Sequence, residues 1–598
     1  MVTAAAIAAA ALPPLLTHNV SPSATFWNQA LAFGLWGLFV LLSAPRLNAR
    51  DQRGTLPLQT ALLLLMAAAG WSWLHGALPA SLALSALGTL AAAALMVAAG
   101  AGSQRQPVAT ADPASASPSF IAFCWGFAAA GALSLLVALV QVFMPSWCNS
   151  DWIACSGYPG RAVGNMRQPN HLSSLLTGST IGMLVLFELG RVRRAVAALA
   201  MALLVFGVVL TASRTGLVSV LLLALWGLVD RRLSRQARLL LLAVPLAYLV
   251  SWLLMAQWAA LSAHAFGGSA RLAETDISSS RFGIWRDTLR LIAQQPWTGV
   301  GFGEFNLAWT LTPSPHRPVA FFDHTHNLLL QFAVELGLPL AVLLTALLSW
   351  ALVRDLVLRR GAVPGAAGVA QRSAMAMVLM MGVHSQLEYP LWYAYFLLPT
   401  AWVWGHALAA PAAMPAVSAP SGPPRAPSLA LRLAAVALMA GTAFAVGDYA
   451  TVARIFNADS DRPLAERIAA GQRSVFFAHH ADYAAVTTGA AEQVPPRNFE
   501  RVVHYLLDTR LMSAWARSLA AHGKVDEARH LAARVREFKR PEAAPLFAAC
   551  GVASGAASGA ASGASSTPPD SAASSAATGA FACEPPTTAH SWREFSAD

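Results

Sequence analysis

Long apolar segments, each followed by a short polar stretch, run through the first three quarters of the chain. A helix needs roughly 20 apolar residues to cross a bilayer, so this alternation predicts an all-α polytopic membrane protein with about 12–13 transmembrane helices. The first apolar segment lacks a basic start and a clear cleavage site, and we interpret it as a span or signal anchor, not a removed signal peptide. The predicted spans are residues 2–16, 24–44, 57–73, 79–100, 119–144, 171–190, 195–212, 215–229, 238–257, 326–352, 371–387, 391–409 and 429–447.

Arginine clusters lie on every second loop between these spans. Cytoplasmic loops of membrane proteins are enriched in Lys and Arg, so we expect these loops in the cytoplasm and the others in the periplasm of a bacterial inner membrane. The composition agrees, because only 12% of the residues are charged and 56% are hydrophobic. The net charge of +11 is therefore explained by basic cytoplasmic loops that orient the protein in a lipid bilayer. We expect no nucleic acid as a partner.

A long predicted periplasmic loop, residues 258–325, contains a helix of its own. A run of serines at 278–280 precedes this helix and Pro296 follows it, which are start and stop signals. We expect the helix to lie on the membrane surface or to dock against the bundle. Its apolar stripe is predicted to consist of Phe282, Trp285, Leu289 and Ile292.

The chain changes character after residue 448, where charged residues become common. The segment MSAWARSLAAHGKVDEARHLAARVREF predicts two short helices in a tetratricopeptide-like hairpin. A Gly-Ala-Ser tract at 551–580 is too poor in large apolar groups to pack. The predicted domains are 1–257, an N-terminal transmembrane bundle; 258–325, the long loop; 326–447, a C-terminal transmembrane bundle; 448–548, a helical periplasmic domain; and 549–598, a low-complexity tail.

Four of the five cysteines form two candidate pairs, one within a short loop and one near the C-terminus. Cys148 and Cys155 lie in one short loop, and Cys550 and Cys583 lie near the C-terminus. A disulfide is possible in each pair if both regions face an oxidising compartment. Free thiols are the alternative for either pair.

Polar residues at the outer boundary of the span near 171–190 form the first candidate site. Gln168, Asn170 and His171 could contact a sugar or a phosphate. The alternative is an interfacial cap, in which Asn170 satisfies the free amides of the next helix.

Two arginines are candidate phosphate ligands. Arg214 lies in a very tight predicted hairpin, where its forked donors could hold a phosphate, although snorkelling to lipid headgroups is the alternative. Arg281 lies at the start of the loop helix and close to its apolar stripe. We expect Arg281 to point into a site and Arg290 to be solvated.

His326 stands where the long loop becomes a span, with His324 and Asn327 beside it. A neutral imidazole is a suitable general base for a hydroxyl group. The alternative is a structural histidine satisfied within the core. Glu335 lies deeper along the helix, where a carboxylate is costly unless paired, and is expected to support the site rather than to react.

His384 and Glu388 end another predicted span on the outer side. The aromatic residues that follow fit an interfacial belt or a wall on which sugars stack. The sequence has no Walker loop, no Rossmann glycine pattern and no metal-binding DxD. A pump or a nucleotide-dependent transferase is therefore disfavoured.

The motifs together resemble a known family. QPNHL at 168–172, SRTG at 213–216, PWTGVGFGEFN at 296–306, HTHNLLLQFAVELG at 324–337 and HSQLEYPLWYAYFL at 384–397 resemble the pilin-glycosylation ligases, which are bacterial O-oligosaccharyltransferases of the O-antigen ligase and polymerase superfamily. The resemblance covers roughly residues 1–548. HTHN is shared with O-antigen ligases, whereas LEYPLWY and the HGKVDEA hairpin at 522–528 favour protein glycosylation.

The resemblance implies a glycosyltransferase that needs no metal, nucleotide or other cofactor. Such an enzyme moves a preassembled oligosaccharide en bloc from undecaprenyl diphosphate to Ser or Thr of a periplasmic protein such as pilin. His326 matches the family's essential histidine, and Arg214 and Arg281 match the arginines that engage the diphosphate. Further expected substrate contacts are His324, Asn327, Gln168, Asn170, His171, His384 and Glu388, with Glu335 structural.

Three other functions stay open at this point. An O-antigen ligase would transfer the glycan to lipid A-core, and a polymerase would extend a glycan with the same donor chemistry. A flippase for lipid-linked glycans would carry out no covalent step, but its polar residues should cross the membrane midplane rather than collect at one boundary.

Overall fold

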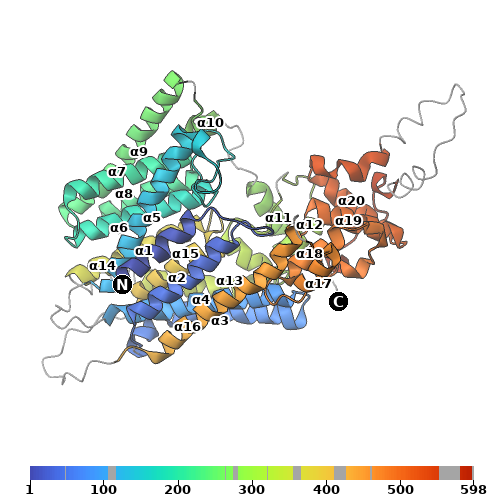
Figure 1. Cartoon of the computed structure of the whole chain (residues 1–598), viewed down its shortest axis with the longest axis horizontal. Coiled ribbons are helices and arrows are strands. Elements are labelled where there is room, and N and C mark those ends of the chain that lie inside the picture. Colours follow the sequence, from blue (N-terminus) through green and yellow to red (C-terminus); the bar gives the residue numbers. More distant parts are fainter. Residues whose placement is uncertain are drawn as a thin grey trace, which may run out of the picture. The chain divides into compact units, whose positions relative to one another are not determined.

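The computed structural model describes residues 1–47, 49–105, 116–262, 264–273, 281–318, 321–354, 365–409, 426–457, 461–550 and 580–595. Within these ranges the chain is helical and contains no β-strand (Figure 1). Arg359, Arg360 and Arg425 of the arginine clusters, the serine run at 278–280 and nearly all of the Gly-Ala-Ser tract lie outside the described residues.

Each predicted span forms a helix, which confirms the all-α prediction. Nine helices in the described part of the chain are long and apolar enough to cross a membrane, so the protein is a multi-pass membrane protein. Two shorter apolar helices, α1 and α8, accompany them. The helices at the predicted spans are α1 (Val2–Leu15), α2 (Phe26–Ser43), α3 (Ala49–His75), α4 (Ala80–Gly102), α5 (Pro118–Phe143), α6 (Pro169–Glu188), α7 (Arg194–Thr211), α8 (Arg214–Val229), α9 (Arg235–Ser262), α13 (Leu328–Val353), α14 (Gly365–His384), α15 (Ala394–Leu408) and α16 (Leu429–Ala453).

Helix α6 carries more hydroxyl side chains than a simple span would. Thr177, Ser179 and Thr180 each donate a hydrogen bond to the carbonyl four residues earlier, at 2.8–2.9 Å. This back-bonding satisfies a hydroxyl inside an apolar helix. All three are buried, so α6 is a central helix and not a lipid-facing one.

The chain forms two compact units. The first unit comprises residues 1–64, 88–277 and 344–446, and the second comprises residues 65–87, 278–343 and 447–598. The five predicted domains follow the chain, whereas these units group segments from different parts of it, and the predicted domain boundaries stay a prediction.

The first unit has an aromatic core between closely packed helices. The Phe123 ring stacks on Trp402 at 5.1 Å and meets Trp36 at a tilt of 54°, 5.9 Å away. Glycines allow the backbones to approach, because a Cβ at Gly100 would lie 1.9 Å from the Trp402 carbonyl oxygen. Small residues serve this purpose in many membrane helix contacts.

The second unit contains the predicted tetratricopeptide-like hairpin, formed by α19 (Thr509–Ala521) and α20 (Val525–Glu537). Asp508 caps α19 by accepting a hydrogen bond from the Leu511 backbone N–H. Gly523 turns the chain between the helices at a φ of +82°, a conformation that favours glycine. The unit also contains α11 (Arg281–Gln294), α12 (Phe305–Leu311), α17 (Leu464–Gly471) and α18 (Ala478–Thr487).

Helix α11 ends before Pro296 as predicted, and two members of the predicted apolar stripe lie on its exposed side. Phe282 and Leu289 are 65% and 57% exposed. The buried face instead includes Asp287, because its carboxylate accepts a hydrogen bond from the Ser314 hydroxyl at 2.8 Å. Hydrophobic spacing alone could not show that a partner from a later loop satisfies this carboxylate.

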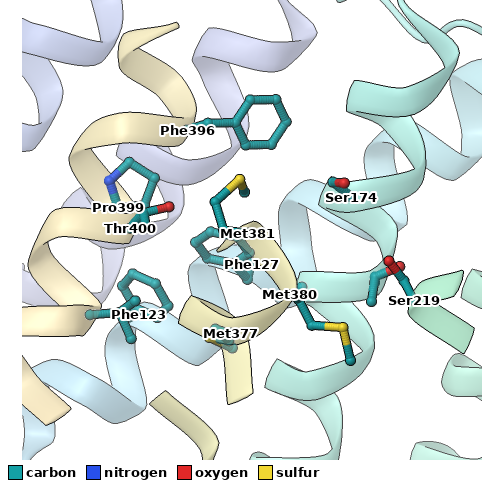
Figure 2. Close-up of a pocket in the computed structure, with 13 residues that line it drawn as sticks. Phe123, Phe127, Ser174, Ser219, Met377, Met380, Met381, Phe396, Pro399 and Thr400 are labelled. Carbon is teal, nitrogen blue, oxygen red and sulfur yellow. The ribbon is translucent and has the colours of Figure 1, made fainter. Parts of the chain in front are cut away.

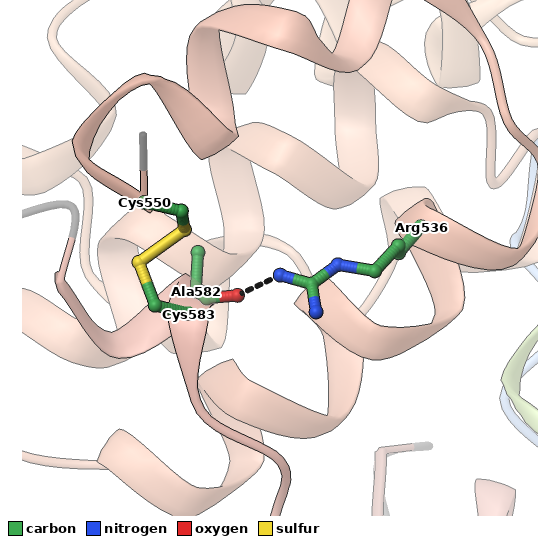
Figure 3. Close-up of a disulfide and its surroundings, with 4 residues drawn as sticks. All are labelled: Arg536, Cys550, Ala582 and Cys583. Carbon is green, nitrogen blue, oxygen red and sulfur yellow. Dashed lines mark hydrogen bonds between the residues drawn. A yellow bond between two sulfur atoms is a disulfide. The ribbon is translucent and has the colours of Figure 1, made fainter. Parts of the chain in front are cut away.

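A disulfide joins Cys550 to Cys583 (Figure 3). Beside it, Arg536 of α20 donates a hydrogen bond to the Ala582 carbonyl at 2.7 Å. Residues 580–595 are therefore fastened to the hairpin at the end of the chain. Cys148 and Cys155 are free thiols, so of the two possible disulfides only the C-terminal one is present among the described residues.

Candidate functional site

The predicted site residues fall into two groups, one in each unit. The first unit contains Gln168, Asn170, His171, Arg214, His384 and Glu388, and the second contains Arg281, His324, His326, Asn327 and Glu335. We describe each group by itself.

Asn170 is the centre of the group in the first unit. Its Nδ2 donates a hydrogen bond to Glu388 Oε1 at 2.9 Å, and its Oδ1 accepts one from the Ser213 hydroxyl at 2.7 Å. Ser213 in turn caps α8 by accepting from the Gly216 backbone N–H. The start of α6, the hairpin before α8 and the segment after α14 are thus joined by one amide.

Gln168, and not Asn170, caps helix α6. Its Oε1 accepts a hydrogen bond from the Asn170 backbone N–H at 2.9 Å. The interpretation of Asn170 as an interfacial cap is therefore wrong. The Asn170 side chain is engaged with two other elements, a role that local sequence could not reveal.

Arg214 is the first residue of α8 and follows a tight turn. Ala212, at the end of α7, has a φ of +49° in the left-handed region, which reverses the chain within two residues. Arg214 is half-buried. The predicted hairpin is confirmed, and it restricts where this guanidinium can lie.

His171 is buried among aromatic rings. Its imidazole lies 4.7 Å from the Tyr393 ring and 5.2 Å from the Phe396 ring, centre to centre. The Tyr395 hydroxyl lies 3.5 Å from Nδ1, while Nε2 has no hydrogen-bond partner among the described residues. Tyr395 is buried, so the interfacial-belt interpretation is wrong for this tyrosine, whereas Trp392 is exposed.

A small cavity of about 30 Å³ lies between α5, α6, α8, α14 and α15. Ser174 and Ser219 lie on one side of it and Phe396, Pro399 and Thr400 on the other, with methionines between them (Figure 2). The Ser174 hydroxyl is also 2.7 Å from His384 Nδ1. The cavity is therefore mostly apolar, with a polar contact to His384 at its wall. Its lining is Phe123, Phe127, Ser174, Thr177, Gly178, Ser219, Met377, Met380, Met381, Phe396, Pro399, Thr400 and Val403.

In the second unit, a short loop presents His326. The Thr325 backbone N–H donates to Gln331 Oε1 at 2.8 Å, and the Thr325 carbonyl accepts from Trp285 Nε1 at 3.0 Å. Asn327 caps the following helix by accepting from the Leu330 backbone N–H. Between these anchors His326 adopts a φ of +56°, a conformation that non-glycine residues adopt only when their surroundings hold it.

The surroundings of His326 favour its neutral form. Its ring lies 4.6 Å from that of His324, which is itself paired with Asp323. Burial, then His324, then Arg281 lower the pKa of His326 to about 2, and Asp323 opposes the shift. Arg281 therefore lies near enough to His326 to act on it electrostatically, as its predicted orientation requires, whereas Arg290 is half-exposed and pairs with Asp287.

Glu335 lies beneath this loop and makes hydrogen bonds to backbone groups. The Phe305 N–H at the start of α12 donates to Glu335 Oε1 at 3.4 Å, and the Glu335 carbonyl accepts from the Gly301 N–H at 3.0 Å. These contacts attach the PWTGVGFGEFN segment to α13. Of these contacts, the one from Phe305 gives the deep carboxylate a partner that is not an arginine, and the structural role assigned to Glu335 remains a proposal.

Four polar residues near these groups were not singled out from the sequence. Glu304 and Asn306 are buried polar members of the PWTGVGFGEFN motif, and Asp323 directly precedes His324. His504 lies 200 residues from Glu304 in the chain and is hydrogen-bonded to it. A buried acid in a glycine-rich loop was a usable signal for Glu304, but nothing local pointed to His504.

The part of the chain that the structure describes contains no group of three or more His, Cys, Asp or Glu side chains that could hold a metal ion. What the two groups offer is two half-buried guanidiniums and one neutral imidazole. Guanidiniums bind phosphate oxygens through paired donors, and a neutral imidazole accepts a proton from a hydroxyl.

Comparison with known proteins adds independent information. Residues 199–345 match the family model described as O-antigen ligase, and residues 373–545 match a model described as virulence factor membrane-bound polymerase, C-terminal. Arg214, Arg281 and His326 lie in the first match, and Glu388 and His504 in the second.

Two curated relatives come from Acinetobacter baylyi (strain ATCC 33305 / BD413 / ADP1). A general O-oligosaccharyltransferase is 28% identical over 289 residues, which make up 46% of this chain and 48% of the relative. A ComP-specific O-oligosaccharyltransferase is 26% identical over 289 residues, 47% of this chain and 50% of the relative. The chain spans about half the length of the curated relatives that it matches.

Proposed function

We propose that this chain, which matches the O-antigen ligase family model over residues 199–345 and is similar to two O-oligosaccharyltransferases, transfers a preassembled oligosaccharide from undecaprenyl diphosphate to Ser or Thr of a periplasmic protein such as pilin. The family consists of glycan ligases and O-oligosaccharyltransferases, which are transferases. The similarity to a general and a ComP-specific O-oligosaccharyltransferase supports a protein as the acceptor.

The observation that carries the proposal is the placement of His326, held at a φ of +56° in an anchored loop with His324 beside it. His326 removes the proton from the acceptor hydroxyl as its oxygen bonds to the anomeric carbon of the glycan. The bond between that carbon and the diphosphate oxygen breaks, and undecaprenyl diphosphate leaves with the bonding electrons. Arg281 and Arg214 stabilise the negative charge that builds up on the leaving group, a contribution often worth about 2.7–4 kcal/mol per donor.

The cavity between α5, α6, α8, α14 and α15, at about 30 Å³, is smaller than the hydrocarbon chain of this donor. Its wall is apolar and rich in methionine (Figure 2), a flexible side chain that adapts to irregular ligands. Asn170, His384 and Glu388 are proposed to contact the polar part of the substrate, together with Gln168, His171, His324 and Asn327.

We place the protein in the bacterial inner membrane with these residues on the periplasmic side. The arginine clusters on alternate loops support this orientation. The disulfide between Cys550 and Cys583 supports it too, because disulfides persist in oxidising compartments such as the periplasm.

The test uses a bacterial strain from which this gene is deleted and which is supplied with a lipid-linked donor glycan. Restoring the gene should attach glycan to a periplasmic protein, visible as added mass on its Ser- or Thr-containing peptides. The His326→Ala gene should restore none. Glycan on protein from the deletion strain itself would overturn the proposal.

The second candidate is an O-antigen ligase with lipid A-core as acceptor. The family model matched at residues 199–345 favours it. In the same strain this function would place the glycan on lipopolysaccharide and leave proteins unmodified. A polymerase would instead lengthen the glycan while it is still lipid-linked, and a flippase would form no new bond.

A further inference from the structure

The C-terminal helical region contacts the PWTGVGFGEFN segment through two buried side chains. His504 Nδ1 lies 2.7 Å from Glu304 Oε2, and both side chains are more than nine-tenths buried. Two residues after Glu304, Asn306 Oδ1 accepts a hydrogen bond from the Leu507 backbone N–H at 2.9 Å. The contacts lie within the second unit and join positions about 200 residues apart in the chain.

Asn306 also contacts the segment that leads into the His326 loop. Its Nδ2 donates to the Phe322 carbonyl at 2.9 Å. The amide thus accepts from one backbone and donates to another, which neither a carboxylate nor an apolar side chain can do. Asn306 is buried, so little water is available to replace either hydrogen bond.

Phe322 forms part of the wall against which His326 packs. The two rings meet edge to face, 5.1 Å apart and at 88°. Because His326 is held in a left-handed backbone conformation, the orientation of its ring depends on the neighbours that enclose it. A shift of Phe322 would therefore shift the imidazole.

Two further buried contacts hold the stretch between Asn306 and Phe322 against α20. Arg317 Nε is 2.8 Å from Glu537 Oε2, and His530 Nε2 is 2.9 Å from the Leu311 carbonyl. The C-terminal region is therefore fastened to this segment at Asn306, Leu311 and Arg317, and Asn306 is the point at which the connection reaches Phe322.

We propose that Asn306, held in place by the Glu304–His504 pair, is a positioning residue that connects the C-terminal helical region to His326. In this role the C-terminal region is part of the machinery of the transfer step itself, in addition to any part it plays in acceptor choice. The proposal rests on the proposed function, because it assigns His326 to the chemical step.

The experiment measures single-turnover transfer and donor KM with the full-length protein in nanodiscs, an undecaprenyl-diphosphate-linked oligosaccharide and an acceptor protein. Asn306→Asp keeps the acceptor for Leu507 and loses the donor for Phe322. We expect its transfer rate to fall by about 10²-fold, the effect of a misplacement near 1 Å, while donor KM is unchanged.

The His504 variants test the supporting pair. His504→Ala should also lower the transfer rate, and His504→Asn, whose amide can donate to Glu304, should recover most of it. Ser518→Ala is the matched control, because it removes a buried hydrogen bond to the Val494 carbonyl in the same helical region, away from the HTHN loop. It should leave the transfer rate unchanged.

An Asn306→Asp protein that is folded and transfers at the wild-type rate would overturn the positioning role. An equal loss in Ser518→Ala would do the same, since the effect would then be general destabilisation. If Asn306→Asp does not fold, the difference between His504→Ala and His504→Asn decides, and no difference counts against the role. Failure of the wild-type protein to glycosylate any acceptor protein would instead overturn the proposed function.

Discussion

Asn170 donates a hydrogen bond to Glu388 at 2.9 Å across 218 positions of the chain. The pair joins the QPNHL and LEYPLWY motifs, which are two of the segments that resemble O-oligosaccharyltransferases. Both side chains lie in the first unit, and Asn170 Oδ1 accepts a hydrogen bond from the Ser213 hydroxyl. A direct side-chain contact therefore connects motifs that the sequence shows only as separate segments.

The direction of this hydrogen bond can be tested by exchanging the donor and acceptor side chains. Asn170→Asp places two carboxylates at hydrogen-bonding distance, and like charges at that separation are strongly unfavourable. We expect transfer to fall by about tenfold or more, since 1.4 kcal/mol of lost interaction already gives that factor. Rates measured with a lipid-linked donor and an acceptor protein would show the loss.

The double variant Asn170→Asp with Glu388→Gln reverses donor and acceptor. It restores one hydrogen bond and the original net charge of the pair, so it should recover much of the activity. A double variant that is no more active than Asn170→Asp alone would mean that the pair does not act as a unit.

Arg214 should contribute through its forked donors and not only through its charge. Arg214→Lys keeps the charge but loses the paired geometry that suits phosphate. We expect a raised donor KM in Arg214→Lys and a larger loss in Arg214→Gln, measured with the lipid-linked donor. An equal donor KM for Arg214→Lys and the wild-type protein would contradict a paired contact with the diphosphate.

The profile of kcat/KM against pH should show no loss on its acid side from protonation of His326. Burial, His324 and Arg281 hold the pKa of His326 at about 2, so the folded protein keeps this ring neutral as the pH falls through the normal histidine range. We expect kcat/KM to show no loss centred near about 6.5. A decline centred there in the wild-type profile would contradict this expectation.

The same shift has a consequence for stability. The unfolded chain binds a proton at this histidine below about pH 6.5, while the folded chain does not. Stability is therefore lost as the pH falls below that value. Replacing Arg281 by Gln removes one of the causes and should move the folded-state pKa upward, which NMR of the histidine ring can measure.

The spans were predictable from the sequence because a bilayer imposes a minimum apolar length on every helix that crosses it. The buried face of α11 was not, because Asp287 finds its partner in a later loop. Likewise, Gln168 and Asn170 are both reasonable caps by residue type, and only the folded chain shows that Asn170 is engaged with Ser213 and Glu388 instead.

Candidate site residues could be chosen where a motif resembled a family, and their roles remain proposals; contacts that span the chain gave no such signal. His326, Arg281 and Arg214 could be chosen from short segments. Glu304 and His504 meet across 200 residues, and a single sequence contains no signal for such a pair.

The disulfide between Cys550 and Cys583 should stabilise the C-terminal region without taking part in transfer. It closes a loop with a sequence separation of 33 residues, and native disulfides typically contribute about 2–4 kcal/mol. Replacing both cysteines by serine should lower the free energy of unfolding by that amount in denaturant titrations, at an unchanged transfer rate. A loss of activity in a protein that is still folded would show a role beyond stability.

The most direct test of the central claim uses the purified protein with its lipid-linked oligosaccharide and an acceptor protein, in the wild type and in His326→Ala. The intact mass of the acceptor reports transfer. We predict that the wild type adds the mass of the whole oligosaccharide to a Ser or Thr, and that His326→Ala, folded and binding donor, lowers the rate by about 10²–10⁴-fold, the usual contribution of a general base. An acceptor glycosylated equally by both proteins would contradict the account.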